Sequence, residues 1–300
     1  MIPMALARLT ETHGPSTRLD LPGLGLVSGG LLAVVWGLVR ANELGWTSTT
    51  ILGSFAIGAI FLAGFVAWES RSAEPMLPLR LFRSRQFTAA NVVSLLMYFG
   101  MFGSIFLLAQ FFQVVQHYSP LQAGLRTLPW TIMPVFVAPL AGLVSSRTGT
   151  RPLLVLGMSL MTIALVWMSV VMTPTVDYLL LVPAFVVAGA GMGLFFAPIA
   201  NVVLSAVRPE EEGKASGANN AIRELGGVFG VAVLASVFAT YGSYATGQAF
   251  VDGLIPAMRV GAVVVAFGAL AALALGGRVR TLASEAEADE AFGELGAATA

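Results

Sequence analysis

The stretch GLVSSRTGTRPLL, residues 142–154, decides how the rest of this chain is interpreted. It places two arginines, Arg147 and Arg151, in a short polar break. Residues 127–146 before the break contain no Asp, Glu, Lys or Arg, and the same is true of residues 152–176 after it. Since about 20 apolar residues cross the hydrocarbon core of a bilayer as a helix, the pattern predicts a charged turn between two membrane spans.

The composition of the whole chain agrees with a membrane location. Of the 300 residues, 57% are hydrophobic and only 11% are charged, whereas a soluble domain carries about 25% charged residues. The formal net charge is zero, so no strong field would attract a nucleic acid. The chain has no cysteine, which excludes disulfides, thiolate metal sites and a cysteine nucleophile.

Eight stretches of 18 or more residues lack charged side chains: 21–39, 44–68, 86–125, 127–146, 152–176, 178–207, 225–251 and 260–277. Helices are expected because lipid offers the backbone no hydrogen-bond partners. The stretch 86–125 is too long for one span, and Pro120 breaks it, so we expect helices over about 88–115 and 121–145. The sequence therefore predicts an all-α integral membrane protein with eight transmembrane helices. A soluble protein with buried helices is the less favoured alternative.

The basic residues predict the orientation, because cytoplasmic loops are rich in Lys and Arg. An even number of spans places both termini on one side. That side would hold twelve basic residues: Arg8, Arg18, Arg71, Arg80, Arg83, Arg85, Arg147, Arg151, Arg208, Lys214, Arg278 and Arg280. The other side would hold three, at helix ends: Arg40, Arg126 and Arg259. We expect both termini to be cytoplasmic, in a multi-pass protein of the cell membrane.

The charged turn has the form of a known signature. A short cytoplasmic turn G-x-L-x-D-R-x-G-R is typical of the major facilitator superfamily, and Gly142, Arg147, Gly149 and Arg151 fall at matching positions. Ser146 stands where the family prefers Asp, which removes the acidic half of the lock that this turn forms in the family. The alternative is that the two arginines only obey the positive-inside rule.

Longer segments resemble one branch of that superfamily, the fourteen-helix drug:proton antiporters of the EmrB/QacA type. The resemblance extends over about residues 1–277. The segments that carry it are LDLPGLGL at 19–26, NELGWTS at 42–48, EPMLPLRLFRSRQF at 74–87, FLLAQFFQVVQHYSPLQAGLRTLP at 106–129, GAGMGLFFAP at 189–198 and EEGKASGANNAIRELGGVFGVAV at 211–233.

The resemblance implies a linker hairpin plus the six-helix second bundle of a major facilitator fold. The expected layout is a cytoplasmic N-terminal segment (1–20), the linker helix pair with its cytoplasmic link (21–87), a six-helix C-terminal transporter bundle (88–277) and an acidic disordered cytoplasmic tail (278–300). The family's first six-helix bundle is missing from this chain. We therefore expect the chain to begin at an internal Met of a longer protein.

The implied function is that of the C-terminal part of a secondary active multidrug efflux transporter. Such a protein exports hydrophobic or amphipathic compounds by proton antiport and alternating access. The expected partners are the lipid bilayer, a small hydrophobic or cationic substrate, protons and the missing N-terminal bundle; no cofactor and no nucleic acid are implied. The alternative is a truncated, non-transporting membrane module, inert alone or pairing with a separate N-terminal bundle.

Uncharged polar residues inside the spans are the candidates for a substrate cavity. A side chain that can hydrogen-bond should face protein or water rather than lipid. Gln110 and Gln113 share one helix face because they are three residues apart. Each candidate could instead make an interhelical hydrogen bond, and for the two asparagines in the third and sixth spans packing is somewhat favoured. The candidates are Gln110, Gln113, Asn91, Asn201, Asn219 and Asn220.

Arg223 and Glu224 are the charged residues placed furthest inside a predicted span. Pro209 and the acidic residues after it predict a helix start, which puts Arg223 about 20 Å along that helix. Charges inside the membrane are costly and indicate function, here coupling or gating. A snorkelling anchor is the alternative for Arg223.

Small residues and prolines predict how the helices pack and bend. Pairs of glycines four apart let helix backbones approach closely, and prolines remove a hydrogen bond and bend the helix. The packing candidates are Gly189, Gly193, Gly226 and Gly230, and the kink candidates are Pro129, Pro134, Pro139 and Pro198.

Other classes of function lack their residue patterns. A membrane enzyme would need convergent catalytic groups, but the two histidines, His13 and His117, are far apart and no H-E-x-x-H or G-x-S-x-G motif occurs. An ion channel would need a filter loop or repeated pore-lining charge, and neither is visible. We therefore expect no enzyme and no metal site.

Overall fold

The computed structural model describes residues 20–72 and 75–276 of the chain. These residues form helices and connecting turns, with no strand among them. The long helices are α2 (Leu21–Leu44), α3 (Thr49–Glu69), α4 (Arg85–Gln110), α5 (Pro120–Thr148), α6 (Thr150–Val171), α7 (Tyr178–Ser205), α8 (Glu212–Tyr241) and α9 (Gly247–Ala272). Short helices cover Leu79–Arg83 and Pro209–Glu211, and a π-helix, Phe111–Val115, prolongs α4.

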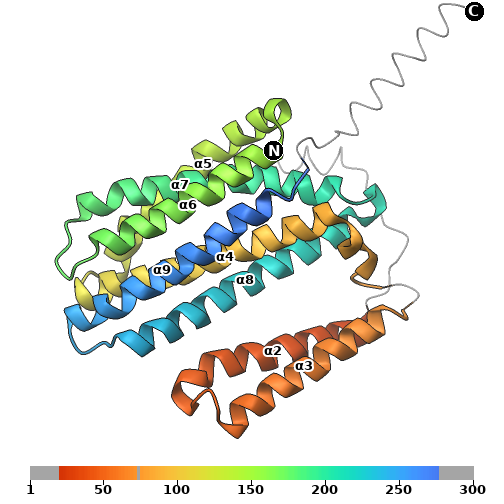
Figure 1. Ribbon diagram of the computed structural model, residues 1–300, viewed down its shortest axis with the longest axis horizontal. Coiled ribbons are helices and arrows are strands. Elements are labelled where there is room, and N and C mark those ends of the chain that lie inside the picture. Colours follow the sequence, from red (N-terminus) through yellow and green to blue (C-terminus); the bar gives the residue numbers. More distant parts are fainter. Residues whose placement is uncertain (1–19, 73–74, 277–300) are drawn as a thin grey trace, which may run out of the picture.

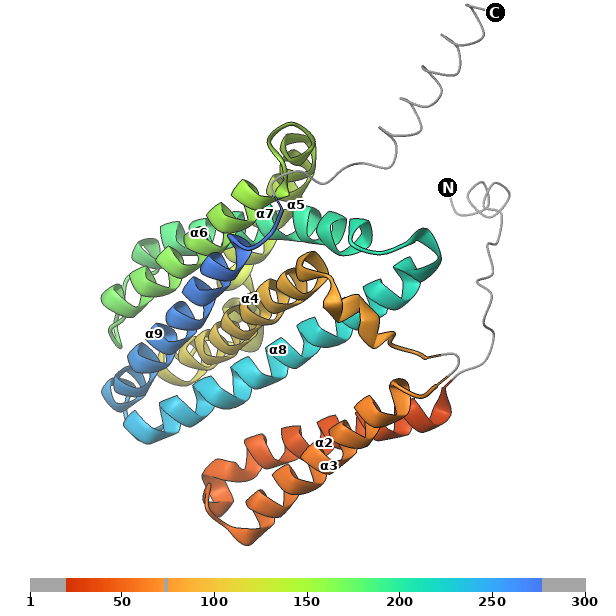
Figure 2. The same cartoon turned by 45° about the vertical axis from the view of Figure 1, so that its right-hand side comes forward.

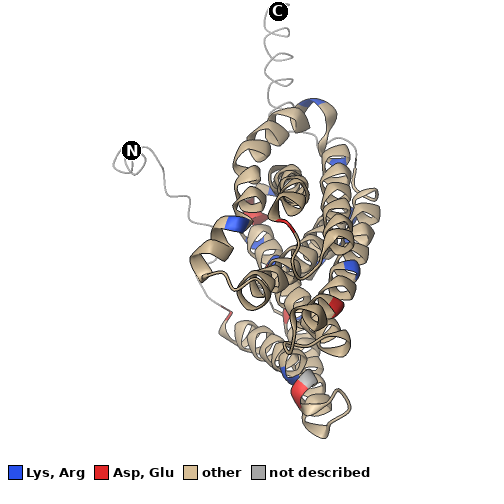
Figure 3. Ribbon diagram, turned by 90° about the vertical axis from the view of Figure 1, so that its left-hand side faces the viewer, with Lys and Arg blue, Asp and Glu red and all other residues tan. Residues whose placement is uncertain are grey.

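Eight helices in the described part of the chain are long and apolar enough to cross a membrane, which confirms the predicted all-α membrane fold. Figure 1 shows helices α4 to α9 as one bundle, with the pair α2–α3 beside it. Figure 2, turned by 45°, shows the same pair nearest to α8. Figure 3 shows that charged residues occupy little of the ribbon.

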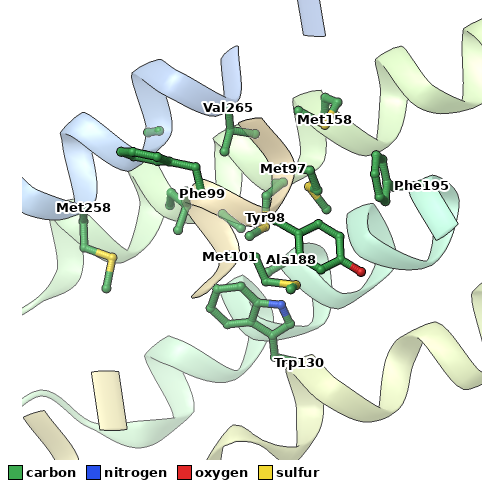
Figure 4. Close-up of a cluster of buried hydrophobic side chains, with 14 of the residues drawn as sticks. Met97, Tyr98, Phe99, Met101, Trp130, Met158, Ala188, Phe195, Met258 and Val265 are labelled. Atoms are coloured by element: carbon green, nitrogen blue, oxygen red, sulfur yellow. The ribbon is translucent and has the colours of Figure 1, made fainter. Parts of the chain in front are cut away.

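The bundle is organised around α4. Helix α8 packs along α4, α9 packs on α4 and α6, and α7 is held between α5 and α6. The buried core between these helices consists mainly of Ala, Leu, Met, Phe and Val side chains, and Figure 4 shows Met97, Met158, Phe195 and Val265 gathered around the α4 backbone. The pair α2–α3 packs on itself and reaches the bundle mainly through α8.

Polar caps explain where the helices begin. The hydroxyl oxygens of Ser48, Ser84 and Thr246 each accept a hydrogen bond from a backbone N–H of the first turn of α3, α4 and α9. Ser119 forms a full capping box with Gln122 at the start of α5. A break before Pro120 was predicted, and α4 and α5 are separate helices there.

The last two spans differ from the predicted ones. The sequence predicted charge-free spans at 225–251 and 260–277, with a link holding Arg259 between them, but α8 ends at Tyr241 and α9 begins at Gly247. Arg259 therefore lies in the middle of α9 and not at a helix end. It and Asp252 occupy the exposed side of α9, so neither charge interrupts the helix.

The helix ends define two ends of the molecule. The links at 70–72 and 75–84, the turn around Gly149 and the turn at 206–211 follow every second span, so they lie together at what we call the arginine-rich end. The predicted N-terminal segment before Asp20 and the predicted tail from 278 lie outside the described residues.

Candidate functional site

The contact between α4 and α8 is the foundation of the site. The two helices run parallel, since Gly226 lies against Leu95 and Gly230, one turn later, against Phe99. A Cβ atom at either glycine would collide with the carbonyl oxygen of the facing residue. Only glycine therefore allows the two backbones to approach this closely.

Asn219 ties α8 to α4 nearer the arginine-rich end. Its side-chain amide donates hydrogen bonds to Asn91 Oδ1 and Ser94 Oγ, both at 3.0 Å. The Asn91 amide in turn donates to the Phe87 carbonyl at 2.9 Å. All three polar side chains are buried, so the structure places Asn91 and Asn219 in a helix–helix contact.

Arg223 lies one turn beyond Asn219 on α8. Its guanidinium carbon stands 4.5 Å from the centre of the Tyr98 ring and 5.8 Å from that of Phe196. Both distances lie within the range of cation–π attraction. The Nε atom is buried and has no hydrogen-bond partner in the described part of the chain. The next residue, Glu224, is exposed and forms no ion pair with Arg223 among the described residues.

Aromatic rings from α4 and α7 surround this arginine. Tyr98 lies 5.7 Å from Phe102, 6.3 Å from Phe195 and 6.4 Å from Phe196, measured between ring centres. Tyr98 and Phe195 are buried, whereas 40% of Phe102 is exposed. Figure 4 shows the Tyr98 ring directed toward Phe195. Three helices thus contribute to one shelf, which we call the Arg223 shelf: Arg223, Tyr98, Phe102 and Phe196.

The glutamine candidates lie elsewhere, near the other end of α4. Gln110 accepts a hydrogen bond from the Tyr244 hydroxyl at 2.5 Å, and the Gln113 amide donates to the Ala109 carbonyl at 3.2 Å. Gln110 follows Tyr98 by twelve residues, which is about 18 Å along a helix. The predicted cavity residues therefore do not form one site.

Tyr244 belongs to the loop between α8 and α9. Although more than half of its side chain is exposed, desolvation raises the pKa of the hydroxyl above its ordinary value. Tyr244 therefore stays protonated and can donate to Gln110 throughout the physiological pH range. The sequence did not single out this contact, because loop and helix residues 134 positions apart carry no local sign of their pairing.

The two remaining asparagines are exposed. Asn201 lies in the last turns of α7, and Asn220 lies on α8 next to the buried Asn219. In the bundle that the described residues form, both side chains are accessible from outside.

The signature turn joins α5 to α6. Arg147 lies in the last turn of α5, Arg151 in the first turn of α6, and Gly149 between them has φ of 83°. That left-handed conformation strongly favours glycine. Gly142 lies within α5, and no ion pair involves either arginine among the described residues. The geometry is that of a tight, positively charged turn.

The other packing and kink candidates lie where α7 meets α5. A Cβ at Gly189 would meet Trp130 and Met133, and one at Gly193 would meet Val137 and Pro134. Three prolines lie inside α5 (Pro129, Pro134 and Pro139), and Pro198 lies inside α7 together with Pro183.

A large cavity of the described residues lies apart from the Arg223 shelf. It measures about 540 Å³ and is enclosed by α2, α3, the link at 75–77 and α8. Its walls are mostly apolar, with Asp20 and Lys214 as the charged members. No group of three His, Asp or Glu side chains that could hold a metal ion occurs within the described ranges.

Comparison with known proteins identifies the family of this chain. The profile of the Major Facilitator Superfamily matches residues 21–231. The tetracenomycin C resistance and export protein of Streptomyces glaucescens is 34% identical over 221 residues, which cover 74% of this chain and 41% of the relative. The methylenomycin A resistance protein of Streptomyces coelicolor is 31% identical over 249 residues, covering 82% and 52%.

The multidrug export protein EmrB of Escherichia coli is 28% identical over 229 residues, covering 76% of this chain and 45% of EmrB. The chain thus spans about half the length of the curated relatives it matches. The family profile covers more than half of the chain, including the helix pair and most of the bundle. The chain belongs to the major facilitator superfamily, a family of membrane transporters.

Proposed function

We propose that this chain forms the linker helix pair and the second six-helix bundle of a secondary active drug exporter. The exporter would remove hydrophobic or amphipathic compounds by proton antiport with alternating access. The relatives named above are resistance and export proteins, which supports this class of substrate. The observation that carries the proposal is the Arg223 shelf, a charge inside a span that is set among partly accessible aromatic rings.

We propose the plasma membrane as the location, with both termini cytoplasmic. In this orientation the arginine-rich end faces the cytoplasm, as the positive-inside rule requires. The substrate site would then lie between this bundle and a first six-helix bundle, since transporters of this kind place their sites between two repeats near the midplane.

One observation favours a second candidate, a module that does not transport alone. Glu224 is the only carboxylate that lies more than three turns from both ends of a described helix. Proton coupling in membranes uses acidic or histidine groups that face the protein interior, whereas Glu224 is exposed, so the described residues offer no clear group for proton coupling. The chain would then be inert or would pair with a separate first bundle.

Transport in everted membrane vesicles separates the two candidates. Vesicles from an efflux-deficient bacterium would contain the chain alone, or a longer protein in which a first six-helix bundle of the same family precedes the chain. Uptake of a fluorescent hydrophobic dye would be followed with and without a proton gradient. Gradient-dependent uptake by the longer protein supports the exporter, whereas no uptake by either form supports the inert module.

A further inference from the structure

Arg223 forms no close ion pair in the described part of the chain. Glu224, its neighbour, is exposed and makes no ion pair with it. Asn219, one turn earlier on the same helix, uses its amide N–H groups for hydrogen bonds to Asn91 and Ser94. Since an unpaired charge inside a membrane is costly, a structure that holds one in place is prepared for an anion from outside the described residues.

The stacking leaves the donors of Arg223 available. A guanidinium that lies over a ring keeps its N–H groups around its edge, where a carboxylate can accept two of them in parallel. The Nε atom is buried, so the donors that a ligand can reach are the two terminal nitrogens, which form no hydrogen bond among the described residues. Tyr98 and Phe196 hold the group from two helices, so its position is set before a ligand arrives.

The rings beside the guanidinium favour a flat ligand. Phe102 is 40% exposed and Phe196 is half-buried, and each lies about 6 Å from Tyr98 between ring centres. Offset stacking on such rings suits an aromatic group. A lipophilic cation, by contrast, would be repelled by the fixed positive charge at this site. The site therefore does not favour the cationic substrates that the family resemblance implies.

We propose that the Arg223 shelf binds the anionic group of a planar aromatic compound. The guanidinium donates to the carboxylate or to an equivalent oxygen anion, and the aromatic part of the compound packs on Phe102 and Phe196. The inference rests on the proposed function in one respect, that the ligand is a transported compound; the binding itself is measurable without transport.

Three probes with one ring system test the charge preference: 9-anthracenecarboxylate, 9-anthracenemethanol and 9-anthracenemethylammonium. The chain would be placed in nanodiscs of zwitterionic phosphatidylcholine, and binding would be measured by fluorescence after subtraction of empty nanodiscs. We expect the carboxylate to bind at least about 10-fold more tightly than the alcohol, and the ammonium compound most weakly. Equal binding of all three would overturn the proposal.

Substitutions test whether the preference for the carboxylate probe comes from the Arg223 shelf. We expect Arg223→Gln to abolish the preference for the carboxylate over the alcohol, and Arg223→Lys to retain part of this preference. Arg259→Gln is the matched control, because it removes an exposed arginine from the outer side of α9. If Arg259→Gln weakened carboxylate binding as much as Arg223→Gln, the shelf would not be the site.

Two further measurements keep the test decisive. Tyr98→Leu, which removes the ring beneath the guanidinium, should weaken carboxylate binding even if Arg223→Gln fails to fold. Repeating the measurement on the longer protein distinguishes a transported anion from a carboxylate of the preceding bundle. A preference retained there supports the proposal, and a preference lost there shows that a protein carboxylate occupies the arginine. Failure of dye transport with the preference intact would overturn the exporter but not the site.

Discussion

Asn219 and Arg223 lie one turn apart on α8, yet only the polar group of Asn219 has hydrogen-bond partners on α4. The Asn219 amide is buried and makes two hydrogen bonds to α4. The Arg223 guanidinium rests on aromatic rings, and its buried Nε has no partner in the described ranges. A satisfied buried amide holds two helices together, whereas an unsatisfied charge is a cost that only a ligand or a further segment can offset.

Replacing Asn219 with leucine should destabilise the bundle. Leucine keeps the branching at Cγ, although it is larger, and it leaves Asn91 Oδ1 and Ser94 Oγ without their donor, at a cost of about 1–2 kcal/mol. Unfolding by SDS in detergent micelles measures the change. Asn220→Leu is the matched control, because Asn220 is the exposed neighbour. Equal stability of the two variants would show that the hydrogen bonds contribute nothing.

Replacing Arg223 with alanine should impair efflux by the proposed full-length exporter by about 10-fold or more, without reducing the amount of protein in the membrane. The reason is the loss of a charge-assisted hydrogen bond to the proposed anionic substrate, which is worth about 1.5–3 kcal/mol. Dye efflux from intact cells, normalised to protein by immunoblot, measures the effect. Normal efflux by this variant would remove Arg223 from the mechanism.

Among the elements, α4 and α8 pack closely along their lengths, and glycine makes this possible. Gly226 and Gly230 face the backbone of α4, and Gly103 of α4 faces Gly230 in return. Such close approach brings the side chains around it into fixed positions. The cation–π contact between α8 and α4 therefore depends on glycines one and two turns away from it.

Adding one methyl group at Gly230 should separate these helices. The Cβ of Gly230→Ala would collide with the Phe99 carbonyl, and overpacking of this kind costs about 1–3 kcal/mol. Gly124→Ala in α5 is the control, since a Cβ there meets nothing within 4 Å. Thermal unfolding in detergent should show a lower midpoint for the first variant only. A midpoint unchanged by Gly230→Ala would mean that the helices can adjust freely.

A second arginine ties the helix ends opposite the arginine-rich end. Arg126 at the start of α5 lies 4.0 Å from the centre of the Tyr118 ring and 4.7 Å from that of Tyr178. The Tyr178 hydroxyl also donates to the Arg126 carbonyl at 3.0 Å. The start of α7 is thereby held to the start of α5. In the sequence, Arg126 served only to predict the orientation, and this contact was not predicted.

At the scale of the whole molecule, the helix pair is attached to the bundle through the arginine-rich end. Lys214 on α8 donates to the Pro75 carbonyl at 2.6 Å, and Arg80 pairs with Glu211. Asp20 accepts a hydrogen bond from the Trp68 indole at 2.9 Å and so closes the pair on itself. The cavity of about 540 Å³ between the pair and α8 lies directly beside these contacts.

Single cysteines can test the orientation, because the chain has none of its own. Ser146 is exposed in the signature turn, and Thr175 is exposed in the α6–α7 loop at the opposite end. The excess of arginines predicts that Ser146→Cys reacts with a membrane-impermeant maleimide only in everted vesicles, and Thr175→Cys only in intact cells. The reverse pattern would invert the proposed topology.

Much of the fold followed from the sequence alone. The eight spans were predictable because each is long and nearly free of charge, and membrane insertion depends on such local composition. The break before Pro120 followed from a local steric rule and carries a capping box in the structure. The start of α9 was missed because charges were counted without knowing that Asp252 and Arg259 share the exposed side of one helix.

By itself, the sequence determined the membrane class, the number of spans, the charged turn and the family, since all of these depend on residues close together in the chain. Only the tertiary structure decided that Asn219 bonds to Asn91, that Tyr244 bonds to Gln110 and that Arg223 lies over Tyr98. These partners are separated by more than 120 positions, and no local pattern encodes such a distance. Helix packing brings them together, because glycines on α8 bring it against α4 in one register.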